Sequence, residues 1–302
     1  MSETLVSVCL ITYNHVNYIN QAIDSVLSQK TDFAWELVIA DDCSTDGTSD
    51  VLATYESRYP QLIRVIKQKV NIGPGKNFIE LLRNARGKYI AYFEGDDYWI
   101  DEYKICKQLP ILESNPQYSM VFTNRLVLNP LGELTEDTFY TKDFYTTKDV
   151  IEGFIPPSQT LMFRNFNSLV PSFEYFSNIY SGDRYLALFC SLSGSIYKLN
   201  DTTAVYRITG SGVWNSNSAL NKLHQNYFLL RAFHISLGIP VDNEILVDMA
   251  FKSSISTFTY CFKRPRLFFK KKNWTVMFHP FKEFYVFSFF KAFVKRIKVK
   301  YF

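Results

Sequence analysis

The sequence predicts an α/β protein with a Rossmann-like, mostly parallel β-sheet that is flanked by helices. The 302 residues are 47% apolar and 21% charged, which is typical of a globular chain with a substantial core. Over residues 1–125, short apolar runs alternate with segments whose apolar residues recur every three or four positions. This alternation is typical of βαβ units on a parallel sheet.

Each apolar run predicts a strand and each amphipathic segment predicts a helix. The first run, Val6–Thr12, is almost continuously apolar, as is typical of a strand buried on both faces. Pro60 and Gly87 indicate where two of the helices end. The elements expected in this half are strands at 6–12, 35–42, 62–68, 88–94 and 118–124, and helices at 18–27, 48–60 and 77–86.

The second half of the chain has a less regular pattern, with no internal repeat. The elements expected there are hairpin-like segments over 125–165, a helix at 183–192, two short strands at 195–200 and 204–209, and helices at 221–238 and 243–262.

The net charge of +4 is distributed unevenly along the chain. Residues 261–302 contain 12 Lys and Arg and one acid, whereas the first 260 residues contain 21 basic and 28 acidic residues. This mixture of basic and aromatic residues favours the surface of an anionic bilayer. A helical subdomain with a solvated basic face is the alternative, and nucleic acid is disfavoured because no nucleic-acid-binding motif accompanies the tail.

The five cysteines are scattered, without a CxxC spacing or a Cys/His cluster, so neither a disulfide framework nor a zinc site is expected. No signal peptide is apparent, and no run of about 18 apolar residues predicts a membrane span. We therefore expect a cytoplasmic protein, and the basic tail suggests peripheral association with the cytoplasmic face of the inner membrane.

Polar loops follow four consecutive predicted strands. They are TYN at 12–14, DDCSTDG at 41–47, NIGPGKN at 71–77 and EGDD at 94–97. Because the carboxyl ends of parallel strands meet at one edge of a sheet, we expect the four loops to line one ligand crevice. For the acids in 41–47, turn formation and helix capping are the simpler alternative.

Three carboxylates are crowded into the last of these loops, at Glu94, Asp96 and Asp97. Like charges this close are unfavourable unless a cation or a hydrogen-bond donor compensates them. Mg²⁺ and Mn²⁺ prefer carboxylate oxygens and take one or two from a protein while phosphates and waters complete the shell. We therefore predict a divalent-metal site formed by Glu94 and Asp96, with Gly95 permitting close approach.

Together, four ordered motifs resemble the family 2 glycosyltransferases, which have the nucleotide-sugar-binding GT-A fold. The resemblance implies a GT-A domain followed by a helical, basic and aromatic C-terminal extension. The matching segments are VSVCLITYNHVNYINQAIDSVLSQ, ELVIADDCSTDGT, NIGPGKN and YIAYFEGDDYW, with weaker matches at 182–184 and 206–214. The implied divisions are 1–125 for the nucleotide-sugar-binding half, 126–215 for the acceptor and catalytic half, and 216–302 for the extension.

The resemblance also implies roles for individual residues on the donor side. The first loop would frame the base and ribose, the second would accept a hydrogen bond from the base, and the third would lie near the base and diphosphate. For Lys76 in that third loop, a solvated surface lysine is the alternative. The implied donor-binding residues are Thr12, Tyr13, Asn14, Asp41, Asp42, Asn71, Lys76, Glu94 and Arg207.

Glu94-Gly95-Asp96 corresponds to the DXD motif of the family. Asp96 would coordinate the metal on the diphosphate, Glu94 would contact the ribose or the metal, and Asp97 would be a local structural carboxylate. Trp99 and Trp214 would lie on the acceptor side, although Trp99 is also explained as a core residue. Thr209 stands where the family usually has His.

Asp183 matches the acid that precedes a helix in the family, and capping of that helix is its alternative role. A base must take the proton of an acceptor hydroxyl, and we expect Asp183 to do so. The resemblance thus implies an inverting, metal-dependent transfer from a nucleotide sugar, specifically a UDP-sugar, to a saccharide acceptor.

The expected acceptor is lipid-linked, in the synthesis of a bacterial surface polysaccharide or of a glycan for glycoproteins. The main alternative is a non-catalytic nucleotide-sugar-binding partner of another transferase. A nucleotidyltransferase is disfavoured because residues 11–20 contain no glycine.

Overall fold

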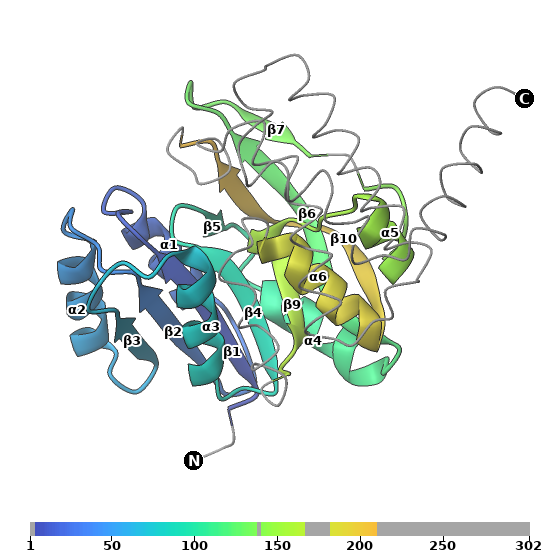
Figure 1. The fold of residues 1–302 in the computed structure, drawn as a ribbon, viewed down its shortest axis with the longest axis horizontal. Coiled ribbons are helices and arrows are strands. Elements are labelled where there is room, and N and C mark those ends of the chain that lie inside the picture. Colours follow the sequence, from blue (N-terminus) through green and yellow to red (C-terminus); the bar gives the residue numbers. More distant parts are fainter. Residues whose placement is uncertain (1–3, 138–139, 167–181, 210–302) are drawn as a thin grey trace, which may run out of the picture. The chain divides into compact units, whose positions relative to one another are not determined.

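The structure is a computed structural model that describes residues 4–137, 140–166 and 182–209 (Figure 1). All of them belong to one compact unit. The extension expected at 216–302 and Trp214 lie outside the described residues. None of the helices in the described ranges combines the length and the apolarity that crossing a bilayer requires.

The described strands form one ten-stranded sheet in the order β3-β2-β1-β4-β9-β6-β10-β5, with β7 paired to β6 and β8 paired to β10. Pairing is parallel from β3 through β4 and between β6 and β10. The strands are β1 (Val6–Thr12), β2 (Trp35–Asp41), β3 (Ile63–Lys67), β4 (Tyr89–Glu94), β5 (Tyr98–Trp99), β6 (Tyr118–Leu128), β7 (Leu134–Glu136), β8 (Phe144–Tyr145), β9 (Leu161–Arg164) and β10 (Ser195–Arg207).

Helices flank the sheet, as expected for an α/β protein (Figure 1). The helices are α1 (Ile19–Leu27), α2 (Thr48–Arg58), α3 (Pro74–Asn84), α4 (Lys104–Ser114), α5 (Thr147–Glu152) and α6 (Gly182–Ser193), with a short 3₁₀ helix η1 (Ser158–Thr160). The predicted fold class, a mixed α/β sheet flanked by helices, is confirmed.

Alternation along the central strands places α1 and α3 on opposite faces of the sheet. Val8 and Leu10 of β1 join a buried cluster with Ile23 of α1. Tyr92 and Phe93 are adjacent in β4, so their side chains lie on opposite faces of the sheet. Tyr92 packs edge-on against Phe78 of α3, with ring centroids 4.8 Å apart. Burial on both faces explains why β1 and β4 are nearly continuous apolar runs.

Two expectations about individual elements were wrong. The strands expected at 195–200 and 204–209 are one strand, β10, which pairs with β6 along its length. Register shifts between Leu199 and Ala204 absorb the polar residues that made the sequence look like two strands with a turn. In addition, α3 begins at Pro74 rather than at residue 77, because Gly73 adopts φ 85° and proline is well suited to a first helical turn.

Helix α4 was not expected from the sequence, and it buries a lysine. Lys104 is 0% exposed, donates a hydrogen bond from Nζ to Oε1 of Gln108 at 2.6 Å, and lies 4.3 Å from the ring centroid of Trp99. Burial lowers the pKa of Lys104 to about 7.

Replacing this lysine is predicted to change how stability depends on pH. Between about pH 7 and 10.5 the unfolded state binds more protons at Lys104 than the folded state, so the free energy of unfolding rises with pH. The Lys104→Met variant should lose that rise, which is at most about 1.4 kcal/mol per pH unit. Urea unfolding at two pH values within the window measures it.

Lys107→Met is the matched control on the same helix. Lys107 is exposed and pairs with Asp101 and Asp201 at 2.7 and 2.6 Å, and these partners raise its pKa. This variant should keep the rise in stability shown by the unsubstituted protein. Identical pH dependence in Lys104→Met and the unsubstituted protein would contradict the prediction.

Candidate active site

The ends of three parallel strands lie side by side at one edge of the sheet (Figure 1). Thr12, the last residue of β1, is in register with Asp41 of β2, and Ile11 is in register with Glu94 of β4. The chain then turns from each strand into one of the polar loops. Register therefore brings the loops at 12–14, 41–47 and 94–97 together, as the sequence predicted.

Hydrogen bonds tie these loops to one another and to the fourth loop. The Oδ1 atom of Asn14 accepts a bond from Thr45 N at 2.8 Å, and Asn14 N donates to Ser44 Oγ at 2.9 Å. The carboxylate of Asp42 accepts bonds from Ile72 N at 2.7 Å and Gly73 N at 2.9 Å. Three of the loops are thus joined by side-chain hydrogen bonds, and the 94–97 loop is joined to the end of β1 by a bond from Gly95 N to the backbone oxygen of Ile11 at 2.9 Å.

Asp41 and Asp42 are both buried, and their carboxylates hold the loops in place. Asp41 accepts bonds from Ser44 N at 3.0 Å, from Ser44 Oγ at 2.5 Å and from Ser49 Oγ. Burial raises the pKa of Asp42, while its two backbone donors oppose that shift. Loop formation, the simpler alternative, therefore accounts for the bonds that these two residues make among the described residues.

Four other donor-side residues are more accessible. Tyr13 is 42% exposed, and the exposed side chains of Asn71 and Lys76 form no hydrogen bond or ion pair with the described residues. Asn14 adopts φ 57°, a left-handed conformation that Asn tolerates better than most residues. A ligand could thus reach an aromatic ring, an amide and an ammonium group here.

Gly95 is packed closely against the first loop. A Cβ atom at this position would lie 2.9 Å from Oγ1 of Thr12 and 3.0 Å from Nδ1 of His15. His15, which sequence reasoning missed, contacts Thr12 Oγ1 through Nδ1 at 3.2 Å. Burial lowers the pKa of His15, and the nearby charge of Asp96 opposes that shift. Its position three residues after Thr12, in the same loop, was the available signal.

Glu94 has an environment that disfavours its charged form. Its Oε1 accepts a bond from Tyr92 Oη at 3.1 Å, and its Oε2 accepts one from Ser158 Oγ at 2.9 Å. Burial, and then the charges of Asp96 and Asp183, raise the pKa of Glu94 to about 7. Tyr92 and Ser158 were also missed, since Ser158 reaches the loop from a distant part of the chain.

Asp97 and Asp96 differ sharply in their surroundings. Asp97 is 1% exposed, and its Oδ1 accepts a bond from Arg207 N at 2.9 Å. Burial, and then the charges of Asp96 and Glu94, raise the pKa of Asp97 well above its usual range. Asp96 is only partly buried, and its carboxylate accepts no hydrogen bond from the described residues.

Arg207 connects the end of β10 to this acidic loop. Its Nη1 donates to the backbone oxygen of Asp96 at 2.6 Å, and its Nη2 donates to Oε1 of Gln21. The guanidinium group also lies 4.4 Å from the ring centroid of Tyr98. Arg207 is therefore built into the support of the loop, and its expected contact with a diphosphate would be an additional role.

Asp183 is the second residue of α6, and its Oδ1 accepts a bond from the backbone N of the next residue, Arg184, at 2.7 Å, so it satisfies one N–H group of the first helical turn. Burial raises its pKa, and the charges of Arg184 and Arg125 oppose that shift. The charge of Asp183 in turn contributes to the raised pKa of Glu94. Asp183 is thus close enough to act electrostatically on Glu94, and its expected role as a base stays a prediction.

Trp99 has the core position that was its alternative explanation. It is 4% exposed, packs on Phe93 with ring centroids 5.0 Å apart, and donates from Nε1 to the backbone oxygen of Gln159 at 2.9 Å. Lys104 covers a face of its ring. The structure therefore gives no support to the expected contact between Trp99 and an acceptor.

The donor set of the acidic loop fits a hard divalent cation that is shared with a ligand. Within residues 4–137, 140–166 and 182–209, no three His, Cys, Asp or Glu residues form a complete protein-built metal site. A phosphate-bound Mg²⁺ or Mn²⁺ needs only one or two carboxylates from the protein. The unpaired carboxylate of Asp96, beside acids whose ionisation is disfavoured, meets that requirement.

The fold and this edge of the sheet define a protein of the GT-A class. Residues 7–168 match glycosyl transferase family 2, and the chain belongs to this family. The resemblance inferred from the four motifs is therefore confirmed.

Relatives with similar sequences include an uncharacterised protein and a protein that is named as a glycosyltransferase. An uncharacterised Mycobacterium tuberculosis protein is 36% identical over 226 residues, which cover 70% of this chain and 60% of that protein. The Bacillus subtilis glycosyltransferase TuaG, named for teichuronic acid biosynthesis, is 33% identical over 161 residues, or 53% of this chain and 62% of TuaG. The chain thus spans about 60% of the length of these curated relatives.

Solved structures with the same fold include two bound to nucleotide sugars. Staphylococcus aureus TarS (residues 1–349) in complex with UDP-GlcNAc has a TM-score of 0.64 and 18% identity, with 93% of this chain and 80% of that chain covered. A Pyrobaculum calidifontis mannosyltransferase with GDP-Man and Mn²⁺ has a TM-score of 0.55 and 14% identity, with coverage of 98% and 88%. At these identities the likeness shows the fold alone, and it confirms the GT-A prediction.

The Glu94→Gln variant is predicted to be more stable than the unsubstituted protein at alkaline pH. Between about pH 4.5 and 7 the folded state binds more protons at Glu94 than the unfolded state, so this residue's contribution to stability falls as pH rises. A neutral amide removes that penalty. We expect a gain of about 2 kcal/mol above pH 7 and little gain near pH 5, measured by denaturant unfolding.

The matched control is Glu113→Gln, because Glu113 is a surface residue paired with Lys88 at 3.6 Å. Its stability should follow that of the unsubstituted protein at both pH values. A Glu94→Gln variant that is equally stable or less stable at the higher pH would show that burial and the neighbouring acids do not destabilise the ionised Glu94 carboxylate.

Proposed function

We propose that the protein is an inverting, metal-dependent glycosyltransferase. It moves a sugar from a nucleotide sugar to a hydroxyl group of a saccharide acceptor. The observation that carries this proposal is the convergence of two acidic groups from distant parts of the chain. Asp96, whose carboxylate has no hydrogen-bond partner among the described residues, lies two residues after β4, and Asp183 at the start of α6 acts electrostatically on Glu94 of the same loop.

The proposed donor is a UDP-sugar, and it would lie across the four loops. The exposed ring of Tyr13 offers a surface for the base, and Thr12 and Asn14 border the ribose. The unpaired ammonium group of Lys76 is suited to a diphosphate. Family membership and the UDP-GlcNAc bound by TarS support this choice. The Pyrobaculum enzyme binds GDP-Man, so a GDP-sugar is the alternative donor to test.

Asp96 would hold the predicted Mg²⁺ or Mn²⁺, with Glu94 as a second ligand or as a partner of the ribose. When bound, such an ion compensates the negative charge that grows on the departing diphosphate. Burial and neighbouring acids raise the pKa of Glu94. A bound cation would counteract that effect, because a nearby positive charge favours the ionised carboxylate.

Asp183 is the proposed general base. Its carboxylate would take the proton from the acceptor hydroxyl as that oxygen forms a bond to the anomeric carbon. The bond from the anomeric carbon to the diphosphate breaks at the same time, on the opposite face of the sugar. The configuration is thereby inverted, so an α-linked donor would give a β-linked product.

The proposed acceptor is lipid-linked, in the synthesis of a bacterial surface glycan. TuaG is named for teichuronic acid biosynthesis, and a 94-residue segment is 34% identical to the abequosyltransferase RfbV of Salmonella typhimurium. The basic and aromatic residues at 261–302 would associate with the cytoplasmic face of the membrane that carries such an acceptor.

Substituting Asp183 is predicted to separate catalysis from donor binding. The Asp183→Asn variant should transfer sugar about 10²–10⁴-fold more slowly, because the base is lost, while it binds donor with unchanged affinity. Transfer and donor hydrolysis would be followed by release of UDP or GDP across a panel of UDP-sugars and GDP-Man in Mn²⁺. Donor affinity would be measured by calorimetry.

Substituting Asp96 is predicted to have a different signature. The Asp96→Asn variant should lose the Mn²⁺-dependent part of donor binding, and chelation of divalent ions should do the same to the unsubstituted protein. Asp50→Asn, at an exposed acid of α2, is the matched control and should behave normally in every assay.

The outcomes decide between the two candidate functions. Normal turnover in both acid variants would overturn the assignment of the site. If the unsubstituted protein binds a nucleotide sugar but turns over no donor in the panel, the protein is a non-catalytic nucleotide-sugar-binding partner of another transferase.

A further inference from the structure

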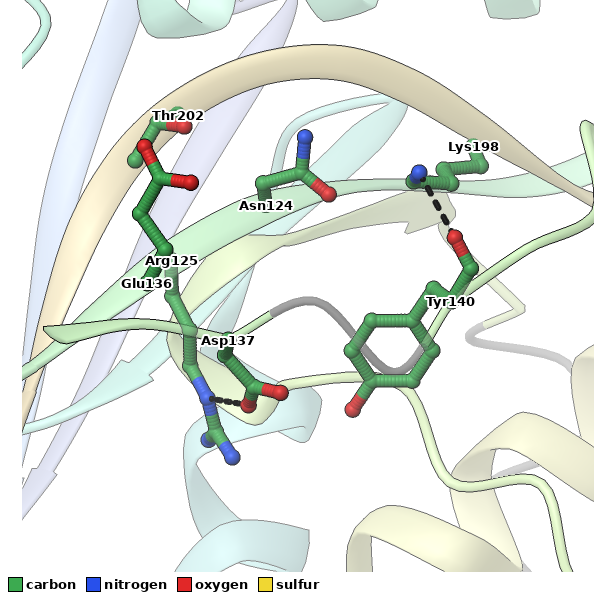
Figure 2. Close-up of a pocket in the computed structure, with 7 residues that line it drawn as sticks. All are labelled: Asn124, Arg125, Glu136, Asp137, Tyr140, Lys198 and Thr202. Atoms are coloured by element: carbon green, nitrogen blue, oxygen red, sulfur yellow. Dashed lines mark hydrogen bonds and ion pairs between the residues drawn. The ribbon is translucent and has the colours of Figure 1, made fainter.

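A small polar pocket lies outside the four donor loops, where β6, β7 and β10 meet (Figure 2). Its volume is about 150 Å³. That is room for roughly five water molecules at about 30 Å³ each, so it suits a single sugar ring rather than an oligosaccharide. Its walls include Asn124 and Arg125 of β6, Glu136 and Asp137 at the end of β7, and Lys198 and Thr202 of β10.

One buried oxygen in this pocket has no partner among the described residues. Asp137 is 6% exposed, and its Oδ2 accepts a bond from Nε of Arg125 at 2.7 Å. Its Oδ1 is buried and accepts no hydrogen bond. Figure 2 shows this second oxygen on the side of Asp137 that faces Tyr140. An unsatisfied buried acceptor costs about 1–3 kcal/mol, which indicates that a donor from outside the chain completes it.

Two of the four charged side chains that line the pocket are already paired with each other, and the lining holds two positive and two negative groups. Arg125 pairs with Asp137, and Lys198 donates from Nζ to the backbone oxygen of Tyr140 at 2.8 Å (Figure 2). An anionic ligand would meet the carboxylates of Glu136 and Asp137, and a cation would meet Arg125 and Lys198. The pocket therefore disfavours a ligand with a strong charge of either sign.

The groups left over are both donors and acceptors. Asp137 Oδ1 accepts, the Nη atoms of Arg125 and the hydroxyl of Thr202 donate, and Thr202 and Asn124 can also accept. Hydroxyl groups, which donate and accept at once, match such a mixed lining. A neutral polyol is thus the ligand class that these side chains select.

The pocket adjoins the proposed active site through Arg125. Its guanidinium group lies 4.8 Å from the ring centroid of Tyr206, the neighbour of Arg207, and Arg207 N bonds to Asp97. The charge of Arg125 also acts on Asp183. A ligand in the pocket would therefore lie next to a residue, Arg125, whose charge reaches the proposed base.

We propose that this pocket binds a neutral sugar residue of the acceptor, with Asp137 Oδ1 accepting a hydrogen bond from one of its hydroxyl groups. The inference rests on the proposed glycosyltransferase function and assigns the acceptor side of the same site. Arg125 orients the Asp137 carboxylate, and Thr202 contributes from the opposite wall.

The test uses the full chain and a panel of methyl glycosides of hexoses and N-acetylhexosamines as probes. Binding is read by ligand-observed NMR in the presence of UDP and the diamagnetic ion Mg²⁺, independently of turnover. At least one glycoside should bind, and Asp137→Asn and Thr202→Val should each weaken it by about tenfold or more, as expected when a buried hydrogen bond is lost. The loss should appear in the acceptor KM rather than in the donor KM.

The matched control is Glu133→Gln, which lies on the same hairpin, bonds only to Asn129 among the described residues, and does not line the pocket. It should bind the glycoside normally. Far-ultraviolet circular dichroism and thermal unfolding identify a variant that has lost its fold, and Thr202→Val, which removes only a hydroxyl, then carries the test.

Failure of this inference can be distinguished from failure of the proposed function. Donor hydrolysis without binding of any glycoside would overturn the inference while the transferase assignment stands. The same holds if donor is hydrolysed and both pocket variants bind a glycoside as tightly as the unsubstituted protein does. If a glycoside binds and both variants weaken it but no donor turns over, the sugar pocket stands and the enzymatic assignment fails.

Discussion

The mutual repulsion of the acids at the end of β4 is the constraint on which the rest of the site depends. Glu94 and Asp97 are held by hydrogen bonds from Tyr92, Ser158 and the backbone of Arg207, and the pKa of each acid is raised. Those donors orient the two carboxyl groups, whose charged forms burial and the neighbouring acids still disfavour. The protein thereby keeps three carboxyl groups crowded together, with Asp96 as the accessible one, and a cation brought by a ligand would favour their charged forms.

The proposed donor surface and the proposed sugar pocket are built differently. In the donor loops, buried carboxylates such as Asp42 fix one loop against another, so the surface exists before any ligand arrives. The pocket beside Asp137 instead keeps an oxygen without a hydrogen-bond partner among the described residues. A preformed surface lowers the entropy cost of binding. An unpaired acceptor favours only a ligand that supplies a hydrogen-bond donor.

Features encoded by neighbouring residues could be predicted from the sequence, and those created by distant contacts could not. Hydrophobic periodicity and turn residues located β1 to β4. The four motifs located the loops, because the carboxyl ends of parallel strands lie at the same edge of a sheet. The continuity of β10 depends on pairing with β6, which no local pattern encodes. Ser158 and Arg125 have ordinary sequence surroundings and become significant only where the fold places them. Trp99 had two interpretations, and packing against Phe93 and Lys104 favours the core.

The single strand β10 has a consequence for how this architecture can diversify. The strand supplies Lys198 and Thr202 to the proposed sugar pocket and its last residue, Arg207, to the acidic loop, and register shifts lie on both sides of Thr202. A bulge absorbs an inserted or deleted residue locally. Changes in length at that point would reshape the pocket wall while Arg207 stays anchored, so new ligand preferences could arise there without disturbing the acidic loop.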